Sequence, residues 1–156
     1  MAEETSCIPT NWTRVIVGGL IAGVGMNIIG GLINGLLLMK YYTYFATRVP
    51  CPSMLSGPAY LGEWVFYVFP FLVGIGIALV YAWARNGCCG PGPKTALCVG
   101  IVIGLLMGVP SSTGALMFGD MGRAIPLGLM LDAFLQAIAG ALIAGAIYKP
   151  KNASGG

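Results

Sequence analysis

Four long runs of apolar residues follow one another along the chain, separated by short segments that hold nearly all of the charged side chains. The runs cover residues 15–39, 64–84, 95–119 and 124–148, and Asp132 is the only charged residue inside them. A helix rises about 1.5 Å per residue, so each run can cross about 30 Å of hydrocarbon. The pattern predicts an all-α integral membrane protein, an antiparallel four-helix transmembrane bundle made of two helical hairpins with Gly-rich packing faces.

The composition agrees with this reading and bounds the domain organisation. Hydrophobic residues make up 57% of the chain and charged residues 8%, whereas about a quarter of the residues of a soluble domain are charged. The segments between the runs are too short to fold by themselves. We therefore expect residues 1–156 to form a single four-span membrane domain.

The Lys and Arg residues favour one orientation of the chain. The side that holds both termini would carry the larger group: Arg14, Arg85, Lys94, Lys149 and Lys151. The opposite side would carry Lys40, Arg48 and Arg123. Because cytoplasmic segments are enriched in Lys and Arg, the distribution predicts that both termini are cytoplasmic.

Glycine accounts for 25 of the 156 residues and recurs at four-residue spacing in three of the runs. Such spacing places residues on one face of a helix, where missing side chains let two backbones approach closely. We therefore predict helix-packing roles for Gly19, Gly23, Gly31, Gly35, Gly100, Gly104, Gly108, Gly128 and Gly140.

Polar residues inside the runs fall into two layers when depth is counted from the charged ends. Asp132 would lie about 13 Å, and Asn34 about 9 Å, below the boundary marked by Arg123 and Lys40. This outer layer would also contain the hydroxyls of Ser112 and Thr113. A middle layer would contain Asn27 and Gln136, each about 20 Å deep.

Asp132 is the candidate functional residue, because an ionised carboxylate inside a bilayer costs at least about 2.5 kcal/mol. No Lys, Arg or His lies within a run to pair with it. The simplest arrangement is a carboxyl group held by Asn34 and the nearby hydroxyls. Three interpretations stay open: a polar link between helices, a proton, cation or substrate site in a cavity, and a contact with another subunit or a bound cofactor.

Some residue types are absent from the chain, and their absence argues against several classes of function. The chain has no His, and haem ligation, much metal binding and many catalytic bases depend on it. Cys88 and Cys89 lack the CxxC spacing that is typical of metal sites. We expect no catalytic residues, no metal, no intrinsic cofactor and no nucleic-acid partner. Bound lipids, or pigments held by a partner, remain compatible with the sequence.

These observations predict a non-catalytic accessory subunit that packs within a larger membrane protein complex. Its partners would be membrane lipids and either other integral membrane subunits or further copies of the chain. The alternative is a homo-oligomeric small transporter or channel that uses Asp132, Asn34, Asn27 and Gln136 as a buried polar path.

Overall fold

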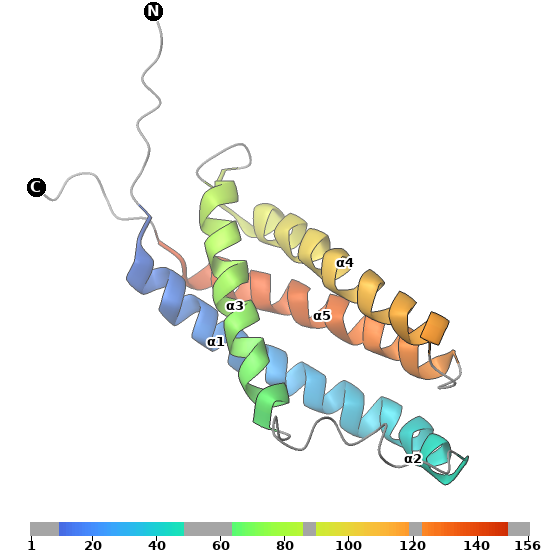
Figure 1. Cartoon of the computed structure of the whole chain (residues 1–156). Helices are drawn as coiled ribbons and strands as arrows, with labels where there is room; N and C mark the ends of the chain where they lie inside the picture. The colour runs from blue at the N-terminus through green and yellow to red at the C-terminus, as the bar shows by residue number, and fades with distance from the viewer. Residues whose placement is uncertain (1–9, 49–63, 86–89, 119–122, 150–156) are drawn as a thin grey trace, which may run out of the picture.

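The computed structural model describes residues 10–48, 64–85, 90–118 and 123–149, and these parts of the chain are almost entirely helical. The elements, shown in Figure 1, are α1 (Trp12–Leu32), the π-helix η1 (Ile33–Leu38), α2 (Met39–Arg48), α3 (Trp64–Ala84), α4 (Pro93–Phe118) and α5 (Ala124–Ile147). Four stretches are long and apolar enough to span a membrane: Trp12–Tyr44, Tyr67–Ala84, Pro93–Thr113 and Ala124–Ile147. The described residues confirm the prediction of an all-helical chain with four helices that could cross a membrane, whereas the orientation of the termini stays a prediction.

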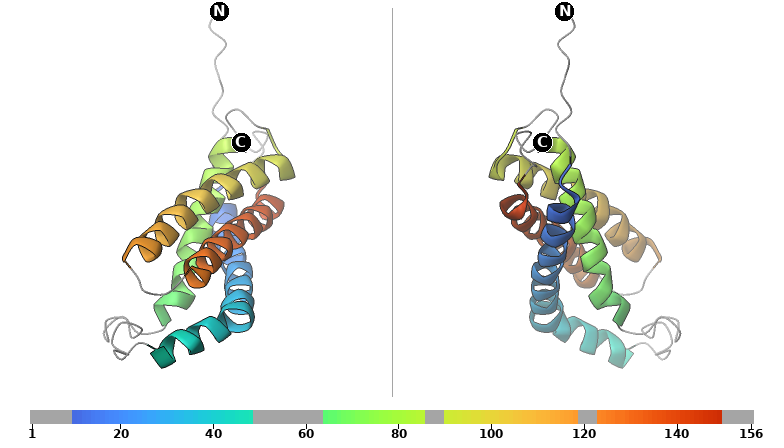
Figure 2. Two further views of the ribbon diagram at one scale, coloured as in Figure 1. Left: turned by 90° about the vertical axis from the view of Figure 1, so that its right-hand side faces the viewer. Right: turned by 90° about the vertical axis from the view of Figure 1, so that its left-hand side faces the viewer.

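The first helix is longer than its apolar run. The apolar run ends at Met39, whereas the helical backbone continues through η1 and α2 to Arg48. The hydroxyls of Thr43 and Thr47 donate to the carbonyls of Met39 and Tyr44, at 2.9 and 2.8 Å. Lys40 marks the end of the apolar run, but the helix continues beyond it. Figure 2 shows α2 turning away from the axis of α1.

Helix α5 contacts more of the other helices than any other element. It packs against α4 along its length and against α1, α3 and η1, while α1 packs mainly against α3 and α5. Figure 1 shows α4 and α5 side by side and antiparallel, with α3 crossing α1. Helix α5 therefore lies between the first helix and α4.

The contact between α1 and α3 follows an antiparallel register with a step of four residues. A Cβ atom at Gly19 would lie 2.7 Å from the backbone nitrogen of Ile75, and one at Gly23 would lie 2.7 Å from Cα of Phe71. One step further, the side-chain amide of Asn27 donates to the carbonyl of Tyr67 at 3.0 Å. Two backbones approach this closely only where side chains are missing.

The same step recurs between α4 and α5. A Cβ atom at Gly100 would lie 2.7 Å from Cα of Ile138, and one at Gly104 would lie 3.1 Å from Cα of Phe134. At Gly108 the added atom would lie 3.1 Å from the carbonyl oxygen of Met130. Each of these three glycines therefore faces the backbone of α5.

A third antiparallel register joins the first helix to α5. A Cβ atom at Gly140 would lie 2.9 Å from Sδ of Met26, and one at Gly128 would collide with the side chain of Leu38. Between these two contacts lies the hydrogen bond from Asn34 to Asp132. The glycines at the two ends let the helices approach closely enough for these two side chains to meet.

Gly31 and Gly35 have no such contact among the described residues. A Cβ atom at either residue would meet nothing described within 4 Å. The register that pairs Asn27 with Tyr67 would place the partners of Gly31 and Gly35 before Trp64, outside the described residues. Their predicted packing role therefore stays a prediction.

The opposite end of the bundle is closed by aromatic side chains. The rings of Tyr81 and Tyr148 are buried and meet edge to face, with 6.1 Å between their centroids. The guanidinium of Arg85 lies 5.8 Å from the centroid of the Tyr148 ring and donates to the Tyr148 carbonyl at 3.2 Å. The Tyr148 hydroxyl is buried without a hydrogen-bond partner.

We expect Tyr148→Phe to leave the free energy of unfolding unchanged or to raise it by about 1 kcal/mol, because a buried hydroxyl without a partner destabilises the fold. The ring contacts with Tyr81 and Arg85 stay in place in this variant. Titration with SDS, followed by circular dichroism, measures the change. A loss of more than about 1 kcal/mol would show that the hydroxyl has a partner in the membrane.

Candidate functional site

Asp132 lies on α5 at the contact with the first helix, and only 6% of its surface is exposed. Its Oδ2 accepts a hydrogen bond from Nδ2 of Asn34 at 2.8 Å, and its Oδ1 accepts one from Nε2 of Gln136 at 2.8 Å. Both oxygens of the carboxyl group are therefore engaged by amides of the same chain. The prediction that Asn34 holds Asp132 is confirmed.

Asn34 is itself held by two further groups. Its Nδ2 also donates to the carbonyl of Gly30 at 3.0 Å, and its Oδ1 accepts from the hydroxyl of Tyr42 at 3.0 Å. Asn34 lies in the π-helix η1, a conformation that is rare and often found at functional positions. The Asn34 amide thus links the Gly30 carbonyl of its own helix to Asp132 on α5.

Gly30 makes room for this arrangement. A Cβ atom at this position would lie 2.7 Å from Nε2 of Gln136, the atom that donates to Asp132. Any larger residue at position 30 would displace the Gln136 amide. The site consists of Asp132, Asn34, Gln136 and Tyr42, which we call the Asp132 cluster.

The residues of the predicted middle layer do not lie together. Gln136 belongs to the Asp132 cluster, because residues four apart on α5 share a face. Asn27 instead donates to the carbonyls of Gly23 and Tyr67, at 3.1 and 3.0 Å. Pro70 lies one turn after Tyr67 and has no N–H to donate within α3. Asn27 thus supplies a donor in the turn that contains the proline.

The hydroxyls of the predicted outer layer do not reach Asp132, so that part of the prediction is wrong. Ser112 Oγ and Thr113 Oγ1 both donate to the carbonyl of Val109 on their own helix, at 3.0 and 2.7 Å. Counting residues along a helix predicts the level of a side chain, but it does not predict on which side of α5 that side chain lies. Helix α4 covers a different side of α5 from the one that carries Asp132.

Two members of the neighbourhood were missed by the sequence reasoning. Tyr42 lies beyond the end of the first apolar run and was not singled out, yet its hydroxyl donates to the side-chain oxygen of Asn34, eight residues earlier. Gly30 does not belong to the set of residues that recur at four-residue spacing in the first helix, so the sequence analysis did not single it out. Eight residues make about two helical turns, so Tyr42 lies on nearly the same face as Asn34 when the helix continues past Met39. This spacing could have identified Tyr42.

The Asp132 cluster brings together one carboxyl group, two side-chain amides and one hydroxyl in a single hydrogen-bond network. Within the described ranges, no group of three or more Asp, Glu, Cys or His side chains could hold a metal ion. The candidate cysteines Cys88 and Cys89 lie outside the described residues.

Comparison of the chain with models of known protein families, with curated proteins and with solved structures gave no match. A functional interpretation therefore depends on the geometry of the helices and of the Asp132 cluster.

Proposed function

We propose that this chain is a small, non-catalytic subunit of a membrane protein complex, which binds another integral membrane protein through an unoccupied glycine face of its first helix. Four apolar candidate spans are consistent with a protein whose surface lies almost wholly in the membrane. The observation that carries the proposal is that no described residue lies within 4 Å of a Cβ atom placed at Gly31 or Gly35.

We call this surface the open glycine face and define it by Ile28, Gly31, Gly35 and Met39, which recur at three- and four-residue spacing. The side chains of Ile28 and Met39 are exposed, and in the part of the chain that the structure describes a Cβ atom at either glycine would meet nothing within 4 Å. Gly19 and Gly23, on the same helix at the same spacing, face α3. Two glycines four residues apart leave a notch in a helix surface that fits a second helix backbone.

The Asp132 cluster supports a structural role for the acid. Both carboxyl oxygens accept hydrogen bonds from amides of this chain, so the acid links α5 to the first helix. A polar link of this kind fixes the register of two helices in a membrane, where such bonds contribute about 0.6 kcal/mol on average.

The proposal is tested by the double variant Gly31→Leu with Gly35→Leu, whose new side chains point into open space and leave the fold intact. The matched control is Gly76→Leu, because Gly76 on α3 also has nothing within 4 Å. The measurement is the mass of the purified protein in mild detergent. We expect the wild type and the control to carry a second polypeptide in fixed ratio and the double variant to lose it by at least tenfold.

Two outcomes would contradict the proposal. A wild-type protein that purifies as a single chain from its own membrane has no partner to bind. Equal retention of the second polypeptide by the double variant and by the control would place the contact on another surface.

The alternative function is a homo-oligomeric proton-coupled transporter that uses the Asp132 cluster. The hydrogen bonds from Tyr42 through Asn34 to Asp132 favour it, because they lead from near the end of the first span to the buried acid. A pure homo-oligomer, and proton uptake into liposomes that Asp132→Asn abolishes, would support this alternative. Under the proposed function the wild type and Asp132→Asn take up protons at the same background rate.

A further inference from the structure

We propose that the groove between the first helix and the start of α5 binds one anionic phospholipid, with its phosphate at Lys40 and an acyl chain against α5. The groove has a volume of about 360 Å³ and is lined by Ile33, Leu37, Leu38, Lys40, Tyr41, Ala124, Gly128 and Leu131. This volume lies within the range of ligand pockets, about 300–1,000 Å³. The inference is independent of the proposed partner protein, because the groove and the open glycine face differ.

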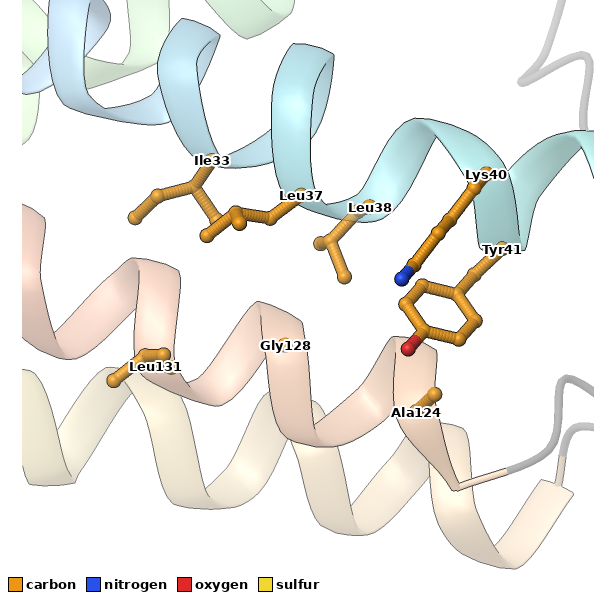
Figure 3. Close-up of a pocket in the computed structure, with 8 residues that line it drawn as sticks. All are labelled: Ile33, Leu37, Leu38, Lys40, Tyr41, Ala124, Gly128 and Leu131. Atoms are coloured by element: carbon orange, nitrogen blue, oxygen red, sulfur yellow. The ribbon is translucent and has the colours of Figure 1, made fainter.

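The groove is apolar along most of its length and polar at one end. Figure 3 shows Ile33, Leu37 and Leu131 at one end, and Lys40 and Tyr41 at the end near Ala124. Gly128 lies between them and contributes no side chain, which gives the groove its depth. Leu37 lines the groove, whereas Gly35 does not.

The polar end carries positive charge that nothing in the described chain neutralises. The ammonium of Lys40 lies 4.9 Å from the centroid of the Tyr41 ring, a cation–π contact that holds it over the end of the groove. Asp132 is the one carboxylate side chain among the described residues, and both its oxygens are bonded to amides. Lys40 therefore has no acidic partner there.

The start of α5 adds to this positive end. Ala124 lines the groove, and the side chain of the N-cap residue Arg123 makes no capping hydrogen bond. The first backbone hydrogen bond runs from Leu127 N–H to the carbonyl of Arg123, so the N–H groups of Ala124 and Ile125 point out of the helix end without a helical partner. The helix dipole and the charge of Arg123 favour an anion at this point.

The length and depth of the groove match one leaflet. From Ala124 to Leu131 the axis of α5 rises about 10 Å, and half of the hydrocarbon core measures about 15 Å. Lys40 and Tyr41 lie close to Tyr44, where the first candidate span ends, at the level of lipid headgroups. A phospholipid placed here sets its phosphate against the cations and its chain against leucine side chains.

The test uses dioleoyl phosphatidylglycerol as the probe and dioleoyl phosphatidylcholine as the neutral control. Lipid is titrated into the delipidated full chain in mild detergent, and bound molecules are counted by native mass spectrometry. We expect one phosphatidylglycerol to bind in preference to phosphatidylcholine. Lys40→Gln should weaken its binding about fivefold. The matched cation variant Lys94→Gln, at the opposite end of the bundle, should leave it unchanged.

A second pair of variants tests the acyl chain. Leu37→Trp fills the groove, whereas Leu36→Trp adds the same ring on a neighbouring residue that does not line it and is 73% exposed. We expect weaker binding only for Leu37→Trp. Equal binding of both lipids, equal losses for Lys40→Gln and Lys94→Gln, or equal binding by the two tryptophan variants would each overturn the proposal.

Discussion

Gly74→Ala should lower the free energy of unfolding by about 3 kcal/mol, the upper end of the usual cost of overpacking a well-packed interior. A Cβ atom at Gly74 would collide with the carbonyl oxygen of Gly19 and lie 2.9 Å from the backbone nitrogen of Gly23. Neither contact is a flexible side-chain end that could move aside. The only relief is separation of α1 from α3 along the whole crossing.

The matched control is Gly76→Ala, two residues away on α3, where a Cβ atom would meet nothing within 4 Å. Alanine is a better helix former than glycine by about 1 kcal/mol, so this variant should be neutral or slightly stabilising. Unfolding of both variants in SDS, followed by circular dichroism, gives the comparison. Equal stability of the two variants would mean that α1 and α3 do not cross at these residues.

Asp132→Ala should lower the free energy of unfolding by about 1–3 kcal/mol, because the variant leaves the amides of Asn34 and Gln136 without their acceptor in a buried place. Asp132→Asn should cost less, since an amide keeps one oxygen acceptor for one of these groups. The control is Ser112→Ala, whose hydroxyl is also buried but bonds only its own helix; we expect a change within about 0.5 kcal/mol.

The same SDS titration distinguishes between two roles for Asp132, a structural link between helices and a strained group kept for another purpose. If the Asp132 cluster links the helices, the order of stability is wild type, then Asp132→Asn, then Asp132→Ala. If Asp132 is instead a strained group kept for another purpose, removing it relieves the cost of a buried polar group. An Asp132→Ala variant more stable than the wild type would therefore contradict the structural role.

The sequence predicted the spans well because the apolar length of a membrane helix is a strong physical constraint. The run at residues 64–84 coincides with α3, and the run at 124–148 ends one residue after α5. The apolar run at residues 15–39 did not show that the helix continues, because the last turns of the helix carry polar and aromatic residues. In these turns the hydroxyls of Thr43 and Thr47 donate to helix carbonyls, which the pattern of apolar residues does not reveal.

The candidate site was predicted in part. Counting along the helices placed Asp132 and Asn34 at a similar level, and the two side chains bond one another. It could not tell that Ser112, at a similar depth, lies on a helix that covers another side of α5. The level of a residue along a helix follows from its position in the sequence. The neighbours of a helix depend on how all the helices pack together, and residue spacing in one sequence does not determine that packing.

The central place of α5 has a consequence for how the protein is made. This helix leaves the ribosome after the other three spans, yet it supplies the contacts that join the first helix to α4. Asn34 is synthesised 98 residues before its acceptor Asp132, so its amide enters the bilayer without that bond. We expect chains truncated before α5 to be recognised and degraded by membrane proteases, while the finished chain escapes them.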